Sequence, residues 1–138
     1  MSTTEVLVAG WPTPKGYSNG RVAEGRVLHV GGQIGWNTKG EFPERGIFES
    51  GFVAQFAQTL DNVLAVVHAA GGRPEDIAEM TVYVVDMPLY RKSRKELAAV
   101  WKERLGKHFP AMALLAVREL FEDKALVEIQ AVAYIGVP

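Results

Sequence analysis

The stretch Ala125-Leu126-Val127-Glu128-Ile129-Gln130-Ala131-Val132-Ala133-Tyr134-Ile135 decides the fold of this chain. Side chains alternate between the two faces of a β-strand, so positions 127, 129, 131, 133 and 135 form one set and the even-numbered positions form the other. The odd-numbered set is entirely apolar, which is typical of a face packed against helices. The even-numbered set carries one carboxylate, Glu128. The pattern predicts a sheet with one helix-covered face and a second face that holds an acid.

Two amphipathic helices are predicted upstream of this strand. The first spans Glu49 to Ala70, where apolar side chains recur at spacings of three and four residues. Gly71-Gly72 follows it and favours a left-handed helix end. The second helix is expected from Pro88 to Leu105, because a proline suits the first turn of a helix. Its apolar positions fall four apart at Leu97, Trp101 and Leu105.

Runs rich in β-formers lie between and around these helices, and each of them predicts a strand. The expected strands are residues 26–31, 80–86, 111–117 and 125–135. Strands alternating with two helices, preceded by a turn-rich N-terminal arm, indicate one α+β domain over residues 1–138. We expect a two-layer sandwich, in which both helices cover the same face of a mixed sheet.

The second face of this sheet needs a cover of its own. Residues 80–85 and 111–117 are largely apolar at both alternating sets of positions. Two helices cover one face only, and a monomer rarely exposes an apolar patch of more than a few hundred Å². Self-association is the simplest cover. The alternative is that the N-terminal arm folds over this face.

Composition excludes several classes of protein. With 48% hydrophobic and 22% charged residues, the chain has no apolar run approaching the roughly 18 residues that span a bilayer. The absence of cysteine removes disulfides, thiolate metal sites and thiol nucleophiles. A net charge of -1 gives no long-range attraction to nucleic acid or to anionic lipid. The N-terminus shows no secretory signal pattern, so a cytoplasmic location is expected.

Glu128 and Tyr17 are the side chains best suited to chemistry. A carboxylate on a partly buried sheet face can act as a general acid or base. The alternatives for Glu128 are an ion pair with an arginine across an interface, or a solvated position at a strand end. Tyr17 lies in the turn-forming segment 15–20, where its hydroxyl could donate to a ligand. Simple packing or a plain turn is the other interpretation of Tyr17.

The segment 31–36 contains three glycines and ends in Trp36, so its backbone could approach a ligand or another chain closely. It lacks the lysine and the following helix of a phosphate-binding loop. His29, His68 and His108 have no ligand-like spacing, so no metal site is expected. The basic residues of the second predicted helix are interrupted by acids, which is typical of a solvated helix face.

Seven segments of the chain resemble, in order and spacing, the RidA (YjgF) family of small enamine and imine deaminases. They are Gly16-Tyr17-Ser18-Asn19-Gly20, Gly32-Gln33-Ile34, Leu60-Asp61-Asn62-Val63-Leu64, Ala69-Ala70-Gly71, residues 81–87, Phe109-Pro110-Ala111 and Val127-Glu128-Ile129. The resemblance covers nearly the whole chain. It implies a chorismate-mutase-like fold, a homotrimer with clefts between subunits, and hydrolysis of enamines and imines without a cofactor.

The resemblance also assigns residues to the site. Glu128 matches the glutamate that positions or activates water, Tyr17 matches the pocket tyrosine, and Gly32 matches the glycine whose backbone lines the cleft. Met112 replaces the arginine that binds the substrate carboxylate in the family. Leu114 stands where a small or polar residue is frequent, and an asparagine of many deaminases is replaced by Pro88.

The expected site is therefore more apolar than that of the deaminases. A thioether cannot neutralise a carboxylate as a guanidinium does. The leading hypothesis is a trimer that hydrolyses a small imine or enamine metabolite of atypical structure. Glu128 and Tyr17 would be catalytic, and Gly32, Trp36, Met112 and Leu114 would shape the cleft. The rivals are a non-catalytic metabolite-binding or interaction trimer and a nucleic-acid-cleaving protein, the latter disfavoured by the lack of a basic docking surface.

Overall fold

A mixed sheet with the strand order β3-β6-β4-β5 forms the centre of the computed structural model, which describes residues 3–43 and 51–136. Its strands are β3 (Arg26–Ile34), β6 (Val127–Ile135), β4 (Ile77–Val84) and β5 (Ala111–Ala116). β6 pairs antiparallel with β3 and with β4, whereas β4 and β5 are parallel. The helices are α1 (Phe52–Ala69), α2 (Met87–Lys92) and α3 (Arg94–Leu105), with a short 3-10 turn, η2, at Pro74–Asp76.

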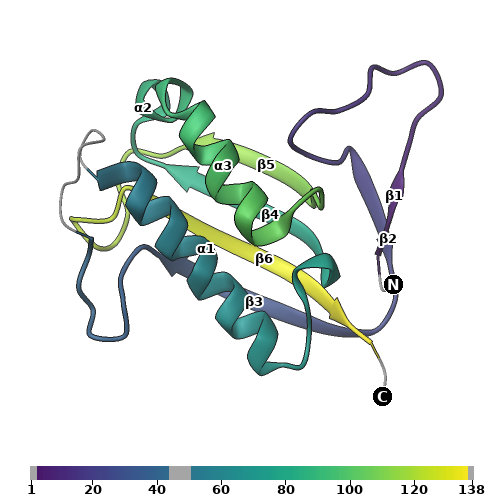
Figure 1. The fold of residues 1–138 in the computed structure, drawn as a ribbon, viewed down its shortest axis with the longest axis horizontal. Coiled ribbons are helices and arrows are strands. Elements are labelled where there is room, and N and C mark those ends of the chain that lie inside the picture. Colours follow the sequence, from purple (N-terminus) through teal and green to yellow (C-terminus); the bar gives the residue numbers. More distant parts are fainter. Residues whose placement is uncertain (1–2, 44–50, 137–138) are drawn as a thin grey trace.

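Figure 1 shows α1 and α3 lying side by side across one face of this sheet. The predicted α+β two-layer architecture with both main helices on the same face is therefore confirmed. The helices α2 and α3 connect β4 to β5. Two parallel strands require such a crossover connection.

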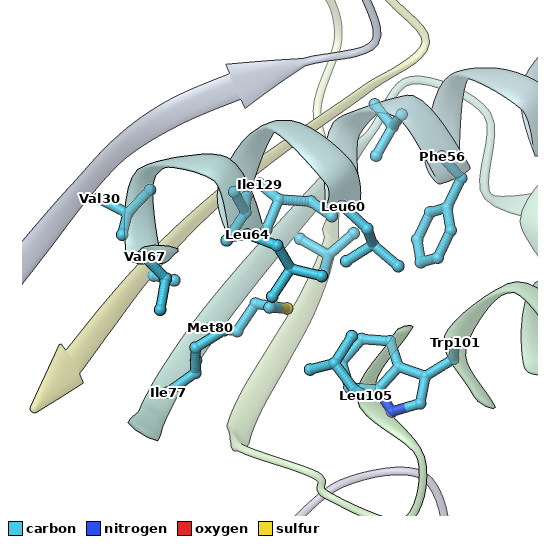
Figure 2. Close-up of a cluster of buried hydrophobic side chains, with 14 of the residues drawn as sticks. Val30, Phe56, Leu60, Leu64, Val67, Ile77, Met80, Trp101, Leu105 and Ile129 are labelled. Carbon is cyan, nitrogen blue, oxygen red and sulfur yellow. The ribbon is translucent and has the colours of Figure 1, made fainter. Parts of the chain in front are cut away.

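The alternation of β6 is also confirmed. Val127, Ile129, Ala131, Ala133 and Ile135 are buried, whereas the residues between them are half-buried or exposed. The buried set packs beneath α1 and beside the inner side chains of β4. In Figure 2, Leu60, Leu64 and Val67 of α1 lie over Met80 and Ile129, and Trp101 and Leu105 reach the same core from α3.

α1 ends where the sequence predicts. Gly71 has a φ of 85°, a left-handed conformation that a side chain disfavours. Its N–H donates to the carbonyl of His68, and the N–H of Gly72 donates to that of Val67, each at 2.9 Å. These bonds satisfy carbonyls that have no partner within the helix. Glu49 and Ser50, the expected start, lie outside the described residues, and the helix begins at Phe52.

The prediction of one helix from Pro88 to Leu105 is wrong, because Ser93 separates α2 from α3. The N–H of Ser93 is shared between the carbonyls of Leu89 and Tyr90, both at 3.1 Å, which tightens the last turn of α2. α2 starts one residue earlier than expected, and the Asp86 carboxylate caps it by accepting a hydrogen bond from the N–H of Leu89 at 3.0 Å.

Several strand bounds differ from those expected: β5 ends at Ala116 instead of residue 117, and β6 begins at Val127 instead of residue 125. β4 begins at Ile77 and ends at Val84, whereas residues 80–86 were expected. β3 runs through the two glycines to Ile34, because a bulge between Val30 and Gln33 absorbs the irregularity. The N-terminal arm, expected as turns, contains the hairpin strands β1 (Thr3–Val6) and β2 (Gly20–Ala23).

The second face of the sheet stays open in this chain. Val27 of β3 is 50% exposed and Leu115 of β5 is 46% exposed, and both belong to the set of positions that points away from the helices. The β1–β2 hairpin stands beside the four-stranded sheet in Figure 1, and the exposed fractions of Val27 and Leu115 show that it does not cover them. The alternative in which the N-terminal arm covers this face is therefore wrong.

Candidate functional site

Glu128 lies on the open face, half-buried near the start of β6. The strand register places it beside Tyr83 of β4 and Ile34 of β3. Its side chain lies over Gly32. A Cβ built on Gly32 would come 2.5 Å from the carboxylate oxygen Oε2 and 2.9 Å from Cδ of Glu128. The glycine thus leaves the space that the carboxylate occupies, and the neighbouring bulge in β3 shapes this space.

This contact gives a testable expectation for Gly32→Ala. The added methyl would displace the Glu128 carboxylate, because the flexible end of that side chain is what it meets. If the carboxylate acts on a substrate, the rate should fall about tenfold or more, since small misplacements of catalytic groups are costly. The melting temperature should change little. The matched control is Gly31→Ala, because a Cβ at Gly31 meets nothing within 4 Å. Equal rates for the two variants, measured as product release, would contradict the assignment.

A cavity of about 700 Å³ opens on the helix side of the sheet. It lies between the loop that carries Tyr17, the helices α2 and α3, and the strand β5, from which Met112 and Leu114 point into it. Parallel pairing of Met112 with Met80 and of Leu114 with Val82 puts both side chains on the face that the helices cover. Three of the residues expected in the site therefore line one cavity.

The loop of Tyr17 is fixed against the start of β5. The N–H of Ser18 donates to the carbonyl of Pro110 at 2.9 Å, and the Ser18 hydroxyl donates to the carbonyl of Phe109. Arg21 donates to the same hydroxyl and to the same carbonyl, at 3.2 and 3.4 Å. These bonds bring Tyr17 to Met112 although the two residues are 95 positions apart in the chain.

Aromatic side chains form much of the cavity wall. The rings of Trp101 and Phe109 are stacked, with centroids 5.7 Å apart and an interplanar angle of 6°. The indole N–H of Trp101 donates to the carbonyl of His108 at 3.1 Å, so its polar atom is satisfied away from the cavity wall. Phe56 and Tyr90 meet edge to face on the α1 side, with centroids 6.4 Å apart.

The phenol of Tyr90 forms part of this wall. Burial raises the pKa of the Tyr90 hydroxyl, and the positive charge of Arg94 opposes this increase by a smaller amount. The hydroxyl therefore remains protonated at neutral pH and is available as a hydrogen-bond donor. Arg94, whose charge opposes the increase, lines the same cavity.

The expected site residues fall in three places. Tyr17, Met112 and Leu114 line the cavity, whereas Glu128 and Gly32 lie on the opposite face, with the sheet between the two groups. Trp36 lies elsewhere, in the loop after β3, where its ring packs against Phe42 at 6.0 Å between centroids. Its carbonyl accepts a hydrogen bond from Asn62 of α1 at 2.8 Å.

Sequence reasoning did not assign Tyr90, Arg94 and Trp101 to the site. Arg94 was placed on a solvated helix face, yet it lines the cavity together with Lys102 and Lys107. A signal for this existed in the sequence. Residues 90, 94, 97, 98 and 101 follow the spacing of one helix face, on which an arginine and a tyrosine accompany the apolar stripe.

Within residues 3–43 and 51–136, none of the helices has the length and apolar character that a membrane-spanning segment needs. No group of three or more His, Cys, Asp or Glu side chains there could hold a metal ion.

A mixed sheet with helices on one face, a bare second face and a cavity at its β5 edge defines a chorismate-mutase-like α+β protein. Solved structures share this fold. The Rid-family protein YyfB from Yersinia pestis matches with a TM-score of 0.78 and 28% identity, over 98% of this chain and 100% of that chain. The YjgF gene product of E. coli matches with a TM-score of 0.67 and 33% identity, over 95% and 98% of the two chains.

Sequence comparisons agree with the fold. The family model described as Endoribonuclease L-PSP matches residues 11–135. The RutC family protein PH0854 of Pyrococcus horikoshii is 33% identical over 124 residues, 89% of this chain and 90% of its own length. The 2-iminobutanoate/2-iminopropanoate deaminase of Escherichia coli K12 is 36% identical over 109 residues, 79% of this chain and 80% of its own. The chain belongs to the RidA (YjgF) family, which is the family that the Endoribonuclease L-PSP model describes.

Proposed function

We propose that this protein hydrolyses a reactive imine, or the enamine in equilibrium with it, to a carbonyl compound and ammonia. The observation that carries the proposal is the pairing of Glu128 with Gly32, where the absence of a side chain leaves room for the carboxylate. The named activity of the E. coli relative, 36% identical to this chain, supports the same reaction class.

The chemistry requires one water molecule and a group that moves protons. The Glu128 carboxylate would accept a proton from water as the oxygen attacks the C=N carbon, and it would return that proton to the nitrogen, which gives a neutral tetrahedral carbinolamine. It would then take the proton of the new hydroxyl group and pass it to the nitrogen, so that the C=O bond forms as the C–N bond breaks and ammonia leaves. Both protons of the water end on ammonia, and Glu128 returns to the carboxylate form. Tyr17 would hold the substrate or the water by a hydrogen bond. Proton transfer by a positioned carboxylate typically contributes about 100- to 10,000-fold to a rate.

The proposed site is shared between copies of the chain. Within one chain the sheet lies between Glu128 and the cavity of Met112, so one substrate does not meet both. A second copy that docks its open face at the cavity edge would bring its Glu128 to the Tyr17 side. The apolar residues of that open face, such as Val27 and Leu115, favour such an interface. A homotrimer with three such sites is the assembly proposed.

The direct test is ammonia release from imines generated freshly by an amino-acid oxidase. The protein should accelerate ammonia release above the spontaneous rate for at least one imine with a bulky apolar side chain. It should act poorly on the imine of alanine, because a methyl side chain fills little of the apolar cavity and Met112 offers no charge that would hold the carboxylate instead. No acceleration with any imine, combined with stabilisation of the protein by the corresponding keto acids, would favour a non-catalytic metabolite-binding trimer instead.

A further inference from the structure

The charges around the cavity are all of one sign. Four of its fifteen lining residues are lysine or arginine and none is aspartate or glutamate. The whole chain is nearly balanced, with 15 basic and 16 acidic residues, so this bias is local. Within residues 3–43 and 51–136, no salt bridge neutralises any of the four. The basic residues are Lys15, Arg94, Lys102 and Lys107.

The rest of the wall is apolar and largely aromatic. Tyr17, Phe56, Tyr90, Trp101 and Phe109 surround the space together with aliphatic side chains. A volume of about 700 Å³ lies within the range of pockets that enclose ligands larger than a three-carbon acid. Cations at the rim and aromatic rings inside favour a ligand with an anionic end and a bulky apolar body.

Arg94 is the best placed of the four cations to hold the anion. Arg94 and Tyr90 both line the cavity, four residues apart in the chain, so a planar guanidinium and a phenolic donor are available in the same wall. Arg94 is also the first residue of α3, where the helix dipole disfavours a cation. An anionic ligand at this position would offset that unfavourable interaction.

We infer that the cavity binds an organic monocarboxylate with an aromatic or similarly bulky apolar body, and that Arg94 pairs with the carboxylate. Arg94 thereby takes over the role of the β5 arginine that Met112 replaces. The inference rests on the proposed function, because it names the substrate class of that same site: imines of aromatic or large aliphatic amino acids. Arg94 acts as a specificity-determining residue. The carboxylate is held from α3 in this protein, instead of from β5, where the family has its arginine.

Calorimetry with three matched probes at pH 7 tests the inference without requiring turnover. The probes are 3-phenylpropanoate, its uncharged analogue 3-phenylpropanamide, and propanoate. The acid with the ring should bind about tenfold or more tightly than either other probe, since it alone supplies both the charge and the apolar body. Arg94→Gln should reduce its affinity to that of the amide and leave the amide unaffected.

The control is Lys95→Gln, which removes an exposed charge from the same turn of α3 at a residue that does not line the cavity. This variant should keep the preference for the acid. Equal affinities of acid and amide, or an unchanged preference in Arg94→Gln, would overturn the inference. Arg94-dependent binding without ammonia release from any imine would support the anion site and reject the deaminase. Ammonia release together with binding that does not depend on Arg94 would support the deaminase and reject the anion site.

Discussion

Glu128→Gln is expected to lower the rate of ammonia release from a bulky apolar imine by about 100-fold or more, because an amide cannot take a proton from water. Glutamine has nearly the shape of glutamate, so it fits above Gly32 and the interface should form as before. The loss should appear in kcat, while the affinity for a keto acid product changes little. The measurement is initial ammonia release from freshly generated imine, corrected for spontaneous hydrolysis.

The matched control for this substitution is Glu79→Gln. Glu79 lies on the same open face, on β4 beside Val132, but it is exposed and farther along the sheet. Its replacement removes the same charge from the face without touching Gly32. Comparable losses in the two variants would mean that the charge of the face, and not the position of Glu128, matters. An unchanged rate in Glu128→Gln would reject the catalytic assignment outright.

Met112→Arg is expected to improve turnover of the imine of alanine relative to a bulky imine by about 100-fold, since a bidentate arginine–carboxylate contact in a desolvated site is worth several kcal/mol. Met112 points into the cavity from β5, so a guanidinium there would hold a short substrate by its carboxylate. The added length should also reduce the space for a bulky side chain. The ratio of kcat/KM for the two imines measures the change.

Met112→Gln is the control, because it adds polarity of similar length without charge. It should not shift the preference toward the small imine. If Met112→Arg folds with an unchanged melting temperature and its preference equals that of the wild type, the β5 position does not govern substrate choice. A shift of equal size in Met112→Gln would show that polarity alone is responsible.

Much of the fold was predictable because its main elements follow simple periodicities. The alternation of residues 127–135 predicted which face of β6 is buried, and the glycines at 71 and 72 predicted the end of α1. The break at Ser93 was not predictable in the same way. It arises from one N–H shared between two carbonyls, and no glycine or proline occupies that position.

The candidate site was predictable only in part. Met112 and Leu114 share a face by strand parity, and the structure brings Tyr17 to them through Ser18 and Arg21. The contact of Ser18 with Phe109 joins residues 91 positions apart, and no local pattern encodes it. Arg94 was assigned to a solvated face because charge runs on helices usually are solvated. It lines the cavity because the loop of Tyr17 and the strand β5 supply the other walls, and no local pattern shows this.

Assembly of the site from two copies of the chain is the central claim, and activity of mixed oligomers tests it most directly. Chains that carry Glu128→Gln and chains that carry Tyr17→Ala are each expected to be inactive alone. The two kinds of chain are unfolded, mixed in equal amounts and refolded together. Because each proposed site takes Glu128 from one copy and the cavity from another, about one quarter of the sites should be intact after random assembly. Recovery of about one quarter of the wild-type ammonia release is the predicted result. A mixture no more active than its two parents would contradict the claim.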